Sequence, residues 1–552
     1  MEKSFIAFVE NSIKKNWDLD ALTDYKGATL QYKDVARKIE KIHIIFEESG
    51  IKPGDKIAVC GRNSSHWGVT FMATLTYGAV IVPILHEFKA DNVHNIVNHS
   101  EARLLFVGDA VWENLNENDM PNLEGIVLMN DFTLMVSRSE KLDYAREHLN
   151  ELFGKKFPRN FRKEHVSYRK DSPEELAVIN YTSGTTSYSK GVMLPYRVLW
   201  SNTKFANEVL SLKAGDRLVS MLPMAHMYGL AFEFLYEFSI GAHIYFLTRM
   251  PSPKIIFQAF ADIKPNLVVA VPLIIEKIIK KSILPKLETP TMKILMKVPI
   301  VNDKIRASIR QKMIEAFGGN FYEVIIGGAA FNQEIEQFLK SIDFPYTVGY
   351  GMTECGPIIA YEDWHKYKMG SCGKAAPRME LKVVSPDPEN VVGEIWTKGE
   401  NVMQGYFKNP QATKEVLTED GWLRTGDLGV MDREGNLTIK GRSKNMLLGP
   451  SGQNIYPEEI EDKLNNMSYV AESIIIQQAD SKLAALIYPE FDAAFAAGLD
   501  EGAIEKTMEE NRVALNAELP AYCQISKVKI YHEEFEKTPK KSIKRFLYQD
   551  VK

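Results

Sequence analysis

The chain has 552 residues, of which 45% are hydrophobic and 25% charged, and its formal net charge is −5. A chain of this length is too long for one hydrophobic core, so we expect roughly two to four domains. The composition is typical of soluble globular protein rather than of a disordered chain, and the charge balance gives no reason to expect nucleic-acid binding.

Three features bear on the compartment. The first 20 residues carry acids and lack a long apolar run, which predicts an amphipathic helix and no signal peptide. The longest apolar run, residues 267–275, is too short to span a bilayer. The four cysteines are far apart and show no metal-ligand spacing, which fits a reducing compartment, so we expect a cytoplasmic protein.

Helical and strand patterns alternate in two stretches of the chain. Between about residues 30 and 110 the patterns predict helices at 34–49 and 67–77 and strands at 56–60 and 79–82. Between about 175 and 350 they predict strands near 176–180, 218–221, 243–247, 267–271, 323–326 and 346–348. Such alternation predicts parallel sheets with helical crossovers, and hence the α/β class.

The pattern changes after residue 365. From about 365 to 441, short strands separated by glycine- and proline-containing turns predict a small antiparallel barrel or sheet. The charged segment that follows is long enough to form a small α+β domain. Its predicted helices are 457–466 and 502–517, and its predicted strands are 472–477 and 483–488. We therefore expect an N-terminal domain at 1–441 and a C-terminal domain at 442–552, with the boundary at 441–444.

A glycine- and hydroxyl-rich stretch, YTSGTTSYSKGV at 181–192, follows the predicted strand 176–180. Small residues leave backbone N–H groups accessible to an anion, and the single Lys190 adds a mobile positive charge suited to a phosphate. Its place at the carboxyl end of a strand is where open α/β sheets bind ligands. The stretch lacks the spacing of a Walker loop, and by composition alone it also fits an ordinary polar surface loop.

Further motifs follow this loop in a fixed order. They are LPMAHMYGL at 222–230, GGAA at 327–330, YGMTE at 350–354, GEI at 393–395, GWLRTGDLG at 421–429, GRSK at 441–444 and GQNIYPEEI at 452–460. Together with the loop they resemble the adenylate-forming superfamily of acyl-CoA synthetases, adenylation domains and luciferases. The resemblance covers nearly the whole chain. It implies a large domain of two α/β lobes and a small β-barrel, followed by a mobile C-terminal domain.

The resemblance implies a set of site residues. Those near ATP or AMP are Thr182, Ser183, Gly184, Thr185, Thr186, Lys190, Gly328, Ala329, Tyr350, Gly351, Thr353, Asp427 and Arg442. The catalytic set is His226, Glu354, Lys444 and Lys541; the acyl pocket is Tyr228, Gly229, Phe232 and Val271; and CoA would lie beside Gly449, Ser451 and Gly452. ATP, Mg²⁺ and CoA are the implied cofactor and substrates.

Chemistry explains several of these residue types. Glu354 would bind Mg²⁺, a hard cation that prefers carboxylate and phosphate oxygens. Asp427 can accept hydrogen bonds from both ribose hydroxyls, and Tyr350 offers a face on which adenine can stack. By resemblance, His226 orients the substrate carboxylate and Lys444 occupies the hinge. Without the motifs these residues would have ordinary roles, as loop or turn-capping acids and as core aromatic side chains.

The sequence departs from the superfamily near its C-terminus. Members carry a lysine there that bridges the α-phosphate and the attacking carboxylate. In KTPKKSIKR, residues 537–545, the corresponding position is Ser542. Our hypothesis is that Lys541 substitutes, with Lys540 and Lys544 as neighbours; the alternative is that the basic run is a solvated tail.

The motifs most resemble fatty-acid ligases, so we expect an AMP-forming ligase that makes acyl-CoA from a medium- or long-chain acid. One alternative transfers the acyl group to a separate acyl carrier protein. Another is a nucleotide-binding protein that has lost adenylation because of Ser542. A membrane-partitioning substrate leaves room for loose peripheral contact with the inner membrane surface, although no basic amphipathic anchor is evident.

Overall fold

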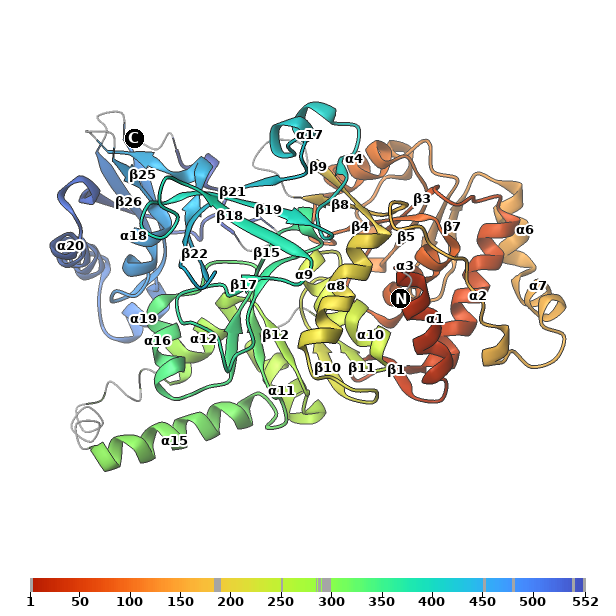
Figure 1. Ribbon diagram of the computed structural model, residues 1–552, viewed down its shortest axis with the longest axis horizontal. Coiled ribbons are helices and arrows are strands. Elements are labelled where there is room, and N and C mark those ends of the chain that lie inside the picture. The colour runs from red at the N-terminus through yellow and green to blue at the C-terminus, as the bar shows by residue number, and fades with distance from the viewer. Residues whose placement is uncertain are drawn as a thin grey trace.

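The computed structural model describes residues 3–182, 190–249, 252–283, 285, 289, 299–449, 453–478, 482–538 and 542–549. The large N-terminal α/β part extends from the right of Figure 1 to its lower left, and a small α+β part formed by the last segment lies at the upper left. The predicted α/β class with a C-terminal α+β part is thereby confirmed. Within these described residues, no helix is both long enough and apolar enough to cross a membrane.

The largest sheet has eight strands in the order β20-β9-β8-β4-β3-β5-β6-β7. In that order the strands are Gly405–Tyr406, Lys190–Pro195, Leu176–Thr182, Val80–Ile84, Lys56–Cys60, Ala102–Val107, Gly125–Leu128 and Leu134–Ser137. The five central strands are parallel, as predicted, but β9, β20 and β7 pair antiparallel. The sheet is therefore mixed. Strand β9 begins at Lys190, only a few residues after β8 ends at Thr182, and this stretch of sequence is too short for the crossover that a parallel pair needs.

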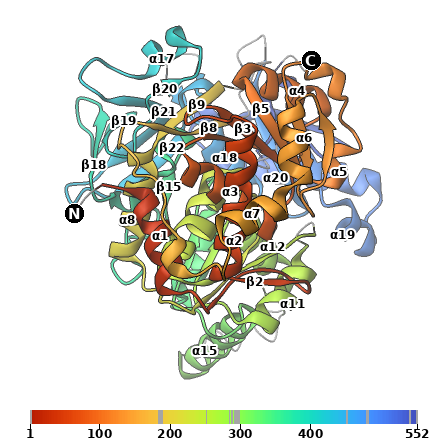
Figure 2. The same ribbon diagram turned by 90° about the vertical axis from the view of Figure 1, so that its right-hand side faces the viewer.

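Side-chain alternation in β3 shows how this sheet is covered. Ile57 and Val59 face the core shared with helices α2 (Tyr32–Glu48) and α3 (Ser65–Tyr77). Ala58 and Cys60 face the opposite core, which includes α4 (Ala90–Ser100). All four are fully buried, so β3 reads as a continuous apolar run, as expected of a central parallel strand. Figure 2 shows α2 and α3 side by side, and the outer helices α6 (Glu140–Glu147) and α7 (Leu149–Lys156) contact α2.

Two further sheets contain parallel pairs. The first has the order β10-β11-β1-β2, formed by Arg217–Ser220, His243–Phe246, Asp20–Asp24 and Thr29–Gln31. Helices α1 (Phe5–Lys15), α8 (Tyr196–Val209) and α10 (Tyr236–Ile240) contact one another beside it. The second has the order β12-β13-β14, formed by Val268–Ala270, Val324–Ile326 and Tyr346–Val348. Its surroundings include α11 (Pro253–Ile263), α12 (Pro272–Ser282), α15 (Pro299–Ala316) and α16 (Gln333–Ser341).

The stretch predicted as a barrel or sheet is antiparallel. Strands β18 (Met379–Val384), β19 (Gly393–Gly399), β21 (Leu423–Met431) and β22 (Leu437–Arg442) form one sheet in that order. Strands β15 (Tyr350–Gly351), β16 (Ile358–Tyr361) and β17 (Lys374–Ala375) form another. Leu437 exchanges backbone hydrogen bonds of 2.7 and 2.9 Å with Cys372 and Gly373, which joins the two sheets. Helix α17 (Pro410–Val416) follows β20.

The C-terminal segment has its own core. Strands β25 (Val470–Gln477), β26 (Leu483–Pro489) and β27 (Ile525–Ile530) form a sheet that packs with α18 (Pro457–Leu464) and α20 (Glu501–Glu518). Strands β23 (Leu447–Leu448) and β24 (Asn454–Ile455) form a short hairpin, and α19 (Phe491–Ala496) follows β26. The predicted helices and strands are confirmed here within a few residues, because each carries its own apolar periodicity.

Candidate active site

A tyrosine, an aspartate and an arginine meet where β15, β21 and β22 come together. The Tyr350 hydroxyl donates to Oδ2 of Asp427 at 2.6 Å, and the Arg442 guanidinium lies 3.1 Å from Oδ1. Asp427 and Arg442 are opposite each other in the β21–β22 ladder. Burial raises the pKa of Asp427 above its usual value, against the opposing effects of Arg442 and the Tyr350 bond. Three residues predicted at the nucleoside are thus in contact.

The turn after β13 brings predicted adenine and acyl residues together. Gly328 and Ala329 are exposed, with Gly328 in a left-handed conformation at φ +88°. A Cβ on Gly328 would lie 3.6 Å from Val271 and 3.8 Å from the Tyr228 ring. The Tyr228 hydroxyl donates to the carbonyl of Ile325 at 3.1 Å, which fixes the ring beneath this turn. The turn predicted to line adenine and two residues predicted for the acyl pocket therefore lie side by side.

His226 lies at the N-terminus of the short helix α9 (Met227–Leu230) and is half-buried. Its Nδ1 accepts from the backbone N–H of Tyr228 at 3.2 Å, so the imidazole caps the helix. Asn180, on the strand that leads to the predicted phosphate loop, donates to the carbonyl of Ala225 at 2.9 Å. These bonds hold His226 beside the carboxyl end of β8.

A buried acid that the sequence analysis missed supports the same segment. Glu233, on the π-helical turn Ala231–Leu235, accepts from the backbone N–H groups of Met221 and Leu222 at 3.0 and 2.8 Å. It also accepts from the Ser220 hydroxyl at 3.2 Å. Burial raises the pKa of Glu233 well above its usual value. The sequence signal that could have identified Glu233 is its place within an apolar run, because an acid buried there is expected to have hydrogen-bond partners.

Two predicted acyl-pocket residues have packing roles. A Cβ on Gly229 would lie 2.8 Å from the carbonyl oxygen of Pro223, so a larger residue would displace α9. The Phe232 ring is buried and packs edge-on against Tyr228 and Phe205, with centroids 6.3 and 6.0 Å apart. Contact of Gly229 or Phe232 with an acyl chain stays a prediction.

Of the loop predicted to bind phosphate, the structure describes the two ends, Thr182 and Lys190. Thr182 and Lys190 face each other across the β8–β9 ladder. The predicted contacts Ser183, Gly184, Thr185 and Thr186 lie outside the described residues. Thr353 and Glu354 form a 3-10 turn with Cys355 directly after β15, in which Thr353 is buried and Glu354 half-buried. Gly351 packs so closely against the carbonyl of Pro357 that no side chain fits there.

Tyr406, which the motifs do not single out, contacts two of the predicted site residues. Its hydroxyl donates to Oε1 of Glu354 at 2.8 Å, and its ring centroid lies 4.9 Å from Nζ of Lys190. It belongs to β20, which pairs with β9 across more than 200 residues of sequence. No local pattern predicts such a pairing, and nothing in the residues around Tyr406 distinguishes it from an ordinary strand aromatic.

The predicted hinge and tail residues lie in the C-terminal part. Lys444 is exposed on the 3-10 turn Ser443–Asn445, and the Gly449 N–H donates to the carbonyl of Gln453 at 2.7 Å. Ser451, Gly452 and Lys541 lie outside the described residues. Lys544 forms an ion pair of 2.5 Å with Glu536. Lys544, one of the three lysines near Ser542 that could supply the tail charge, is therefore paired with a neighbouring acid.

The donor chemistry at Glu354 suits Mg²⁺. The part of the chain that the structure describes contains no group of three or more His, Cys, Asp or Glu side chains that could hold a metal ion. Mg²⁺ usually takes only one or two protein carboxylates and completes its shell with substrate phosphate oxygens and water. A single half-buried carboxylate, linked through Tyr406 to Lys190 at the end of the predicted phosphate loop, fits that mode.

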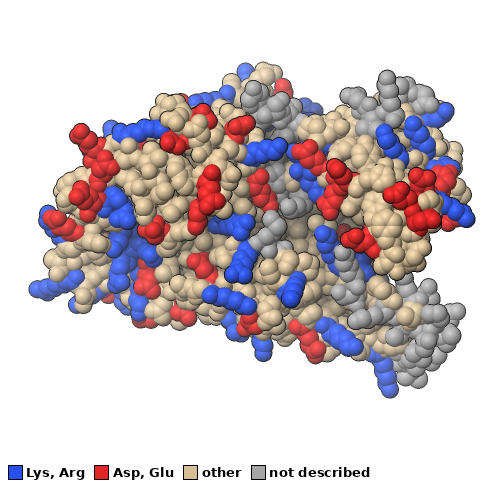
Figure 3. Space-filling view, turned by 180° about the vertical axis from the view of Figure 1, so that it is seen from behind, with Lys and Arg blue, Asp and Glu red and all other residues tan. Residues whose placement is uncertain are grey.

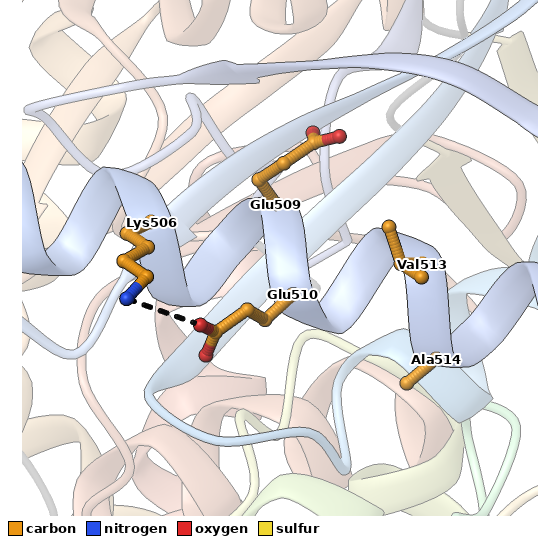
Figure 4. Close-up of a pocket in the computed structure, with 5 residues that line it drawn as sticks. All are labelled: Lys506, Glu509, Glu510, Val513 and Ala514. Atoms are coloured by element: carbon orange, nitrogen blue, oxygen red, sulfur yellow. Dashed lines mark ion pairs between the residues drawn. The ribbon is translucent and has the colours of Figure 1, made fainter.

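The surface outside this site is less specific. On the face in Figure 3, acidic and basic side chains are interspersed over most of the area. A hollow of about 520 Å³ on α20, shown in Figure 4, is lined by Lys506, Glu509, Glu510, Val513 and Ala514. Lys506 and Glu510 form an ion pair of 3.8 Å there. None of these residues belongs to the predicted site.

Two family descriptions match the chain. The one called AMP-binding enzyme matches residues 9–407, and the one called AMP-binding enzyme C-terminal domain matches residues 445–550. The long-chain-fatty-acid–[acyl-carrier-protein] ligase AEE15 of Arabidopsis thaliana is 26% identical, over 88% of this chain and 76% of that protein. The long-chain-fatty-acid–CoA ligase FadD15 of Mycobacterium bovis is 27% identical, over 82% of this chain and 76% of that protein.

Solved structures share the fold. The crystal structure of ATP-bound MatB from Rhodopseudomonas palustris superposes with a TM-score of 0.77 at 20% identity, covering 100% of this chain and 98% of that one. The anthranilate CoA ligase AuaEII in complex with anthranoyl-AMP superposes with a TM-score of 0.79 at 18% identity, covering 99% and 98% of the two chains. The similarity extends over both the large α/β part and the C-terminal part.

Proposed function

Because this chain belongs to the AMP-binding enzyme family and is an adenylate-forming acid–thiol ligase, we propose that its acid is a medium- or long-chain fatty acid and its thiol is CoA. In the first half-reaction the fatty carboxylate attacks the α-phosphate of ATP, giving acyl-AMP and pyrophosphate. In the second, the CoA thiol attacks the acyl carbonyl and AMP leaves. The first step forms the bond between the carboxylate oxygen and the α-phosphorus and breaks the bond to pyrophosphate. The second forms the thioester bond, breaks the acyl–phosphate bond and releases the thiol proton with AMP.

One observation carries the adenylation part of the proposal, and the fatty acid and CoA rest on the similarity to relatives with those names. Tyr350, the first residue of the segment 350–354, contacts Asp427. Glu354, the last residue of this segment, contacts Tyr406, whose ring lies beside Lys190. A nucleotide bound along this segment would meet a carboxylate suited to ribose hydroxyls at one end. At the other end it would meet a carboxylate and a lysine suited to a metal–phosphate group. The exposed Gly328–Ala329 turn supports adenine binding beside Tyr350.

In adenylation, charge neutralisation and positioning do most of the work. We assign Thr182, Lys190 and the loop residues 183–186 to the β- and γ-phosphates, and Thr353 to the α-phosphate. When bound, Mg²⁺ would supply charge neutralisation at the phosphates next to Glu354. Asp427 and Arg442 would hold the ribose.

The acyl side is assigned from the wall beneath the adenine turn. His226 would orient the attacking carboxylate, because its helix cap fixes the imidazole beside the end of β8. Tyr228 and Val271 would contact the acyl chain near its carboxylate, since both lie beside Gly328. Gly229 and Phe232 would contribute through the packing of α9 and the turn that follows it.

Two half-reactions in one pocket require a movement between them, since groups that assist adenylation must leave before the thiol enters. We propose domains at 1–441, with the β-barrel subdomain at about 365–441, and at 442–552, with Lys444 at the hinge. Gly449, Ser451 and Gly452 would line the path of CoA after this movement. Lys541 would supply the tail charge in adenylation.

The test is incubation of the purified chain with ATP, Mg²⁺ and a series of fatty acids from short to long. Hydroxylamine traps acyl-AMP as hydroxamate, and parallel reactions contain CoA or a phosphopantetheinylated acyl carrier protein. We expect hydroxamate with medium or long chains, thioester with CoA, and loss of both in Asp427→Ala. Thioester on the carrier protein but not on CoA would favour the acceptor named for AEE15. ATP binding with neither product would refute adenylation.

A further inference from the structure

We propose that Tyr406 is a positioning residue that links the carboxylate of Glu354 to the ammonium group of Lys190, and so sets the geometry of the metal–phosphate end of the nucleotide site. This inference rests on the proposed function for the identity of the ligand. Tyr406 itself need not touch the substrate. It acts through two groups that do.

The hydroxyl orients the acid. Tyr406 is 6% exposed, and its hydroxyl donates to Oε1 of Glu354 at 2.8 Å. An ordinary tyrosine phenol is protonated near neutral pH, so this hydroxyl can act as a hydrogen-bond donor to the carboxylate. A hydrogen bond from an outer residue fixes the rotamer of a metal-binding carboxylate and leaves its remaining lone pairs directed toward the ligand.

The ring of the same residue contacts the lysine. Nζ of Lys190 lies 4.9 Å from the ring centroid, within the range of a cation–π interaction. Lys190 is half-buried and begins β9 directly after the phosphate loop. A long side chain otherwise has many rotamers, so an aromatic face restricts where its charge lies before nucleotide binds.

The backbone around Tyr406 is bonded to both partners' segments. Tyr406 pairs with Val192 in the β20–β9 ladder, and the Phe407 N–H donates to the carbonyl of Gly191 at 2.7 Å. On the other side, the Met403 N–H donates to the carbonyl of Glu354 at 2.9 Å. The short segment 403–407 therefore holds the 3-10 turn and the end of the phosphate loop at a fixed separation, with Tyr406 between them.

Two substitutions separate the hydroxyl from the ring. Tyr406→Phe removes the bond to Glu354 and keeps the face beside Lys190, whereas Tyr406→Leu removes both. Tyr361→Phe is the matched control, because Tyr361 is also buried and its hydroxyl donates to Glu323 at 3.0 and 3.1 Å, outside the Glu354 pair. All three proteins are checked by their thermal unfolding before binding is measured.

The main measurement is binding, not turnover. Mn²⁺, as a probe for Mg²⁺, is titrated into protein saturated with a non-hydrolysable ATP analogue and followed by electron paramagnetic resonance. We expect Tyr406→Phe to weaken Mn²⁺ binding about 10- to 100-fold, the usual effect of losing an outer-shell partner. Affinity for the metal-free analogue should be unchanged in Tyr406→Phe and lower in Tyr406→Leu. Tyr361→Phe should match the wild type in both.

Two results would overturn the inference. One is wild-type Mn²⁺ affinity in Tyr406→Phe, and the other is an equal loss in Tyr361→Phe, which would indicate a general packing effect. Because Tyr406→Phe is nearly isosteric, poor folding of Tyr406→Leu would leave the first comparison intact. Failure of the proposed function is seen separately, as an absence of hydroxamate in the wild-type reaction, while metal–nucleotide binding can still be measured.

Discussion

At the scale of single residues, the core contains an acid that no ligand or ion pair explains. Glu237, on α10, is 0% exposed, and neither carboxylate oxygen has a hydrogen-bond partner among the described residues. Burial raises its pKa from 4.5 to about 8. Desolvation penalises the charged form, so the carboxyl stays protonated in the fold near neutral pH.

We predict that this carboxyl makes stability depend on pH. Between about pH 4.5 and pH 8 the folded chain binds one more proton here than the unfolded chain, so stability is lost as pH rises, by up to about 1.4 kcal/mol per unit. Glu237→Gln removes this part of the slope. Calorimetric midpoints should therefore move in favour of the variant as pH increases. Parallel curves for the two proteins, or an equal effect in the exposed control Glu415→Gln, would contradict this account.

At the scale of elements, a buried ion pair anchors the hairpin at the C-terminal tail. Two backbone bonds of 2.8 Å, from Thr538 N–H to the Ser542 carbonyl and from Lys544 N–H to the Glu536 carbonyl, define the hairpin. Arg545, which follows it, donates to Glu461 on α18, with one contact of 2.7 Å. Glu461 also accepts from the N–H of Ile475 at 2.7 Å.

We predict that Arg545→Ala loosens this hairpin and impairs adenylation more than thioester formation. Removing one partner of a buried pair leaves an uncompensated charge and costs about 3–5 kcal/mol. Amide exchange at Thr538 and Lys544 should accelerate, and pyrophosphate exchange should fall more than CoA transfer from synthetic acyl-AMP. Lys463→Ala, which removes an exposed pair of 3.4 Å on the same helix, serves as the control. Equal losses in both half-reactions would argue against the assignment.

The sequence of the tail hairpin also includes Lys541, the lysine that we propose for adenylation. If Lys541 supplies the tail charge, Lys541→Ala should cause the same selective loss of pyrophosphate exchange that we expect for Arg545→Ala. Lys544→Ala should have the smaller effect, because its ammonium group already pairs with Glu536 at 2.5 Å. Full exchange activity in Lys541→Ala would refute the substitution hypothesis for Ser542.

At the scale of the molecule, polar contacts join α18 to the large part. Asn332 donates to Asp462 at 3.0 Å and to Asn466 at 2.7 Å, and Lys280 donates to the carbonyl of Asn465 at 2.9 Å. Contacts of this kind resemble transient interfaces, which permit relative motion of domains. Arg442 and Lys444, between the two parts, are exposed.

We predict that Asp462→Ala shifts the population toward arrangements in which α18 has left this contact. Asn332 then loses one acceptor, and no apolar area replaces it. Trypsin cleavage after Arg442 or Lys444 should accelerate, and small-angle scattering should give a larger radius of gyration. Asp492→Ala, an exposed change on α19, should leave both unchanged. An unaltered cleavage rate in Asp462→Ala would mean that other contacts hold the two parts together.

Much of the fold could be predicted from local pattern. The apolar runs at 56–60 and 346–348 are strands with those bounds, and the helix expected at 34–49 is α2 at Tyr32–Glu48. Its earlier start reflects capping by Gln31 and Asp34, a local signal that periodicity alone does not include. The antiparallel strands β7 and β9 each follow their partner strand after a short connection, a local arrangement that the alternation of apolar patterns did not reveal. The pairing of β20 with β9 could not be predicted, because these two strands are remote in sequence.

For this protein, sequence by itself determined the order of the motifs, the α/β class and the residues that match the family's motifs, among them Tyr350, Glu354 and Asp427. Those follow from residue types and spacing, which are properties of the chain. Only the tertiary structure decided that Tyr350 donates to Asp427 and that Tyr406 lies between Glu354 and Lys190. These contacts join segments tens to hundreds of residues apart. They arise because burial of the sheets' apolar faces brings remote strand ends together, and no local pattern encodes which ends will meet.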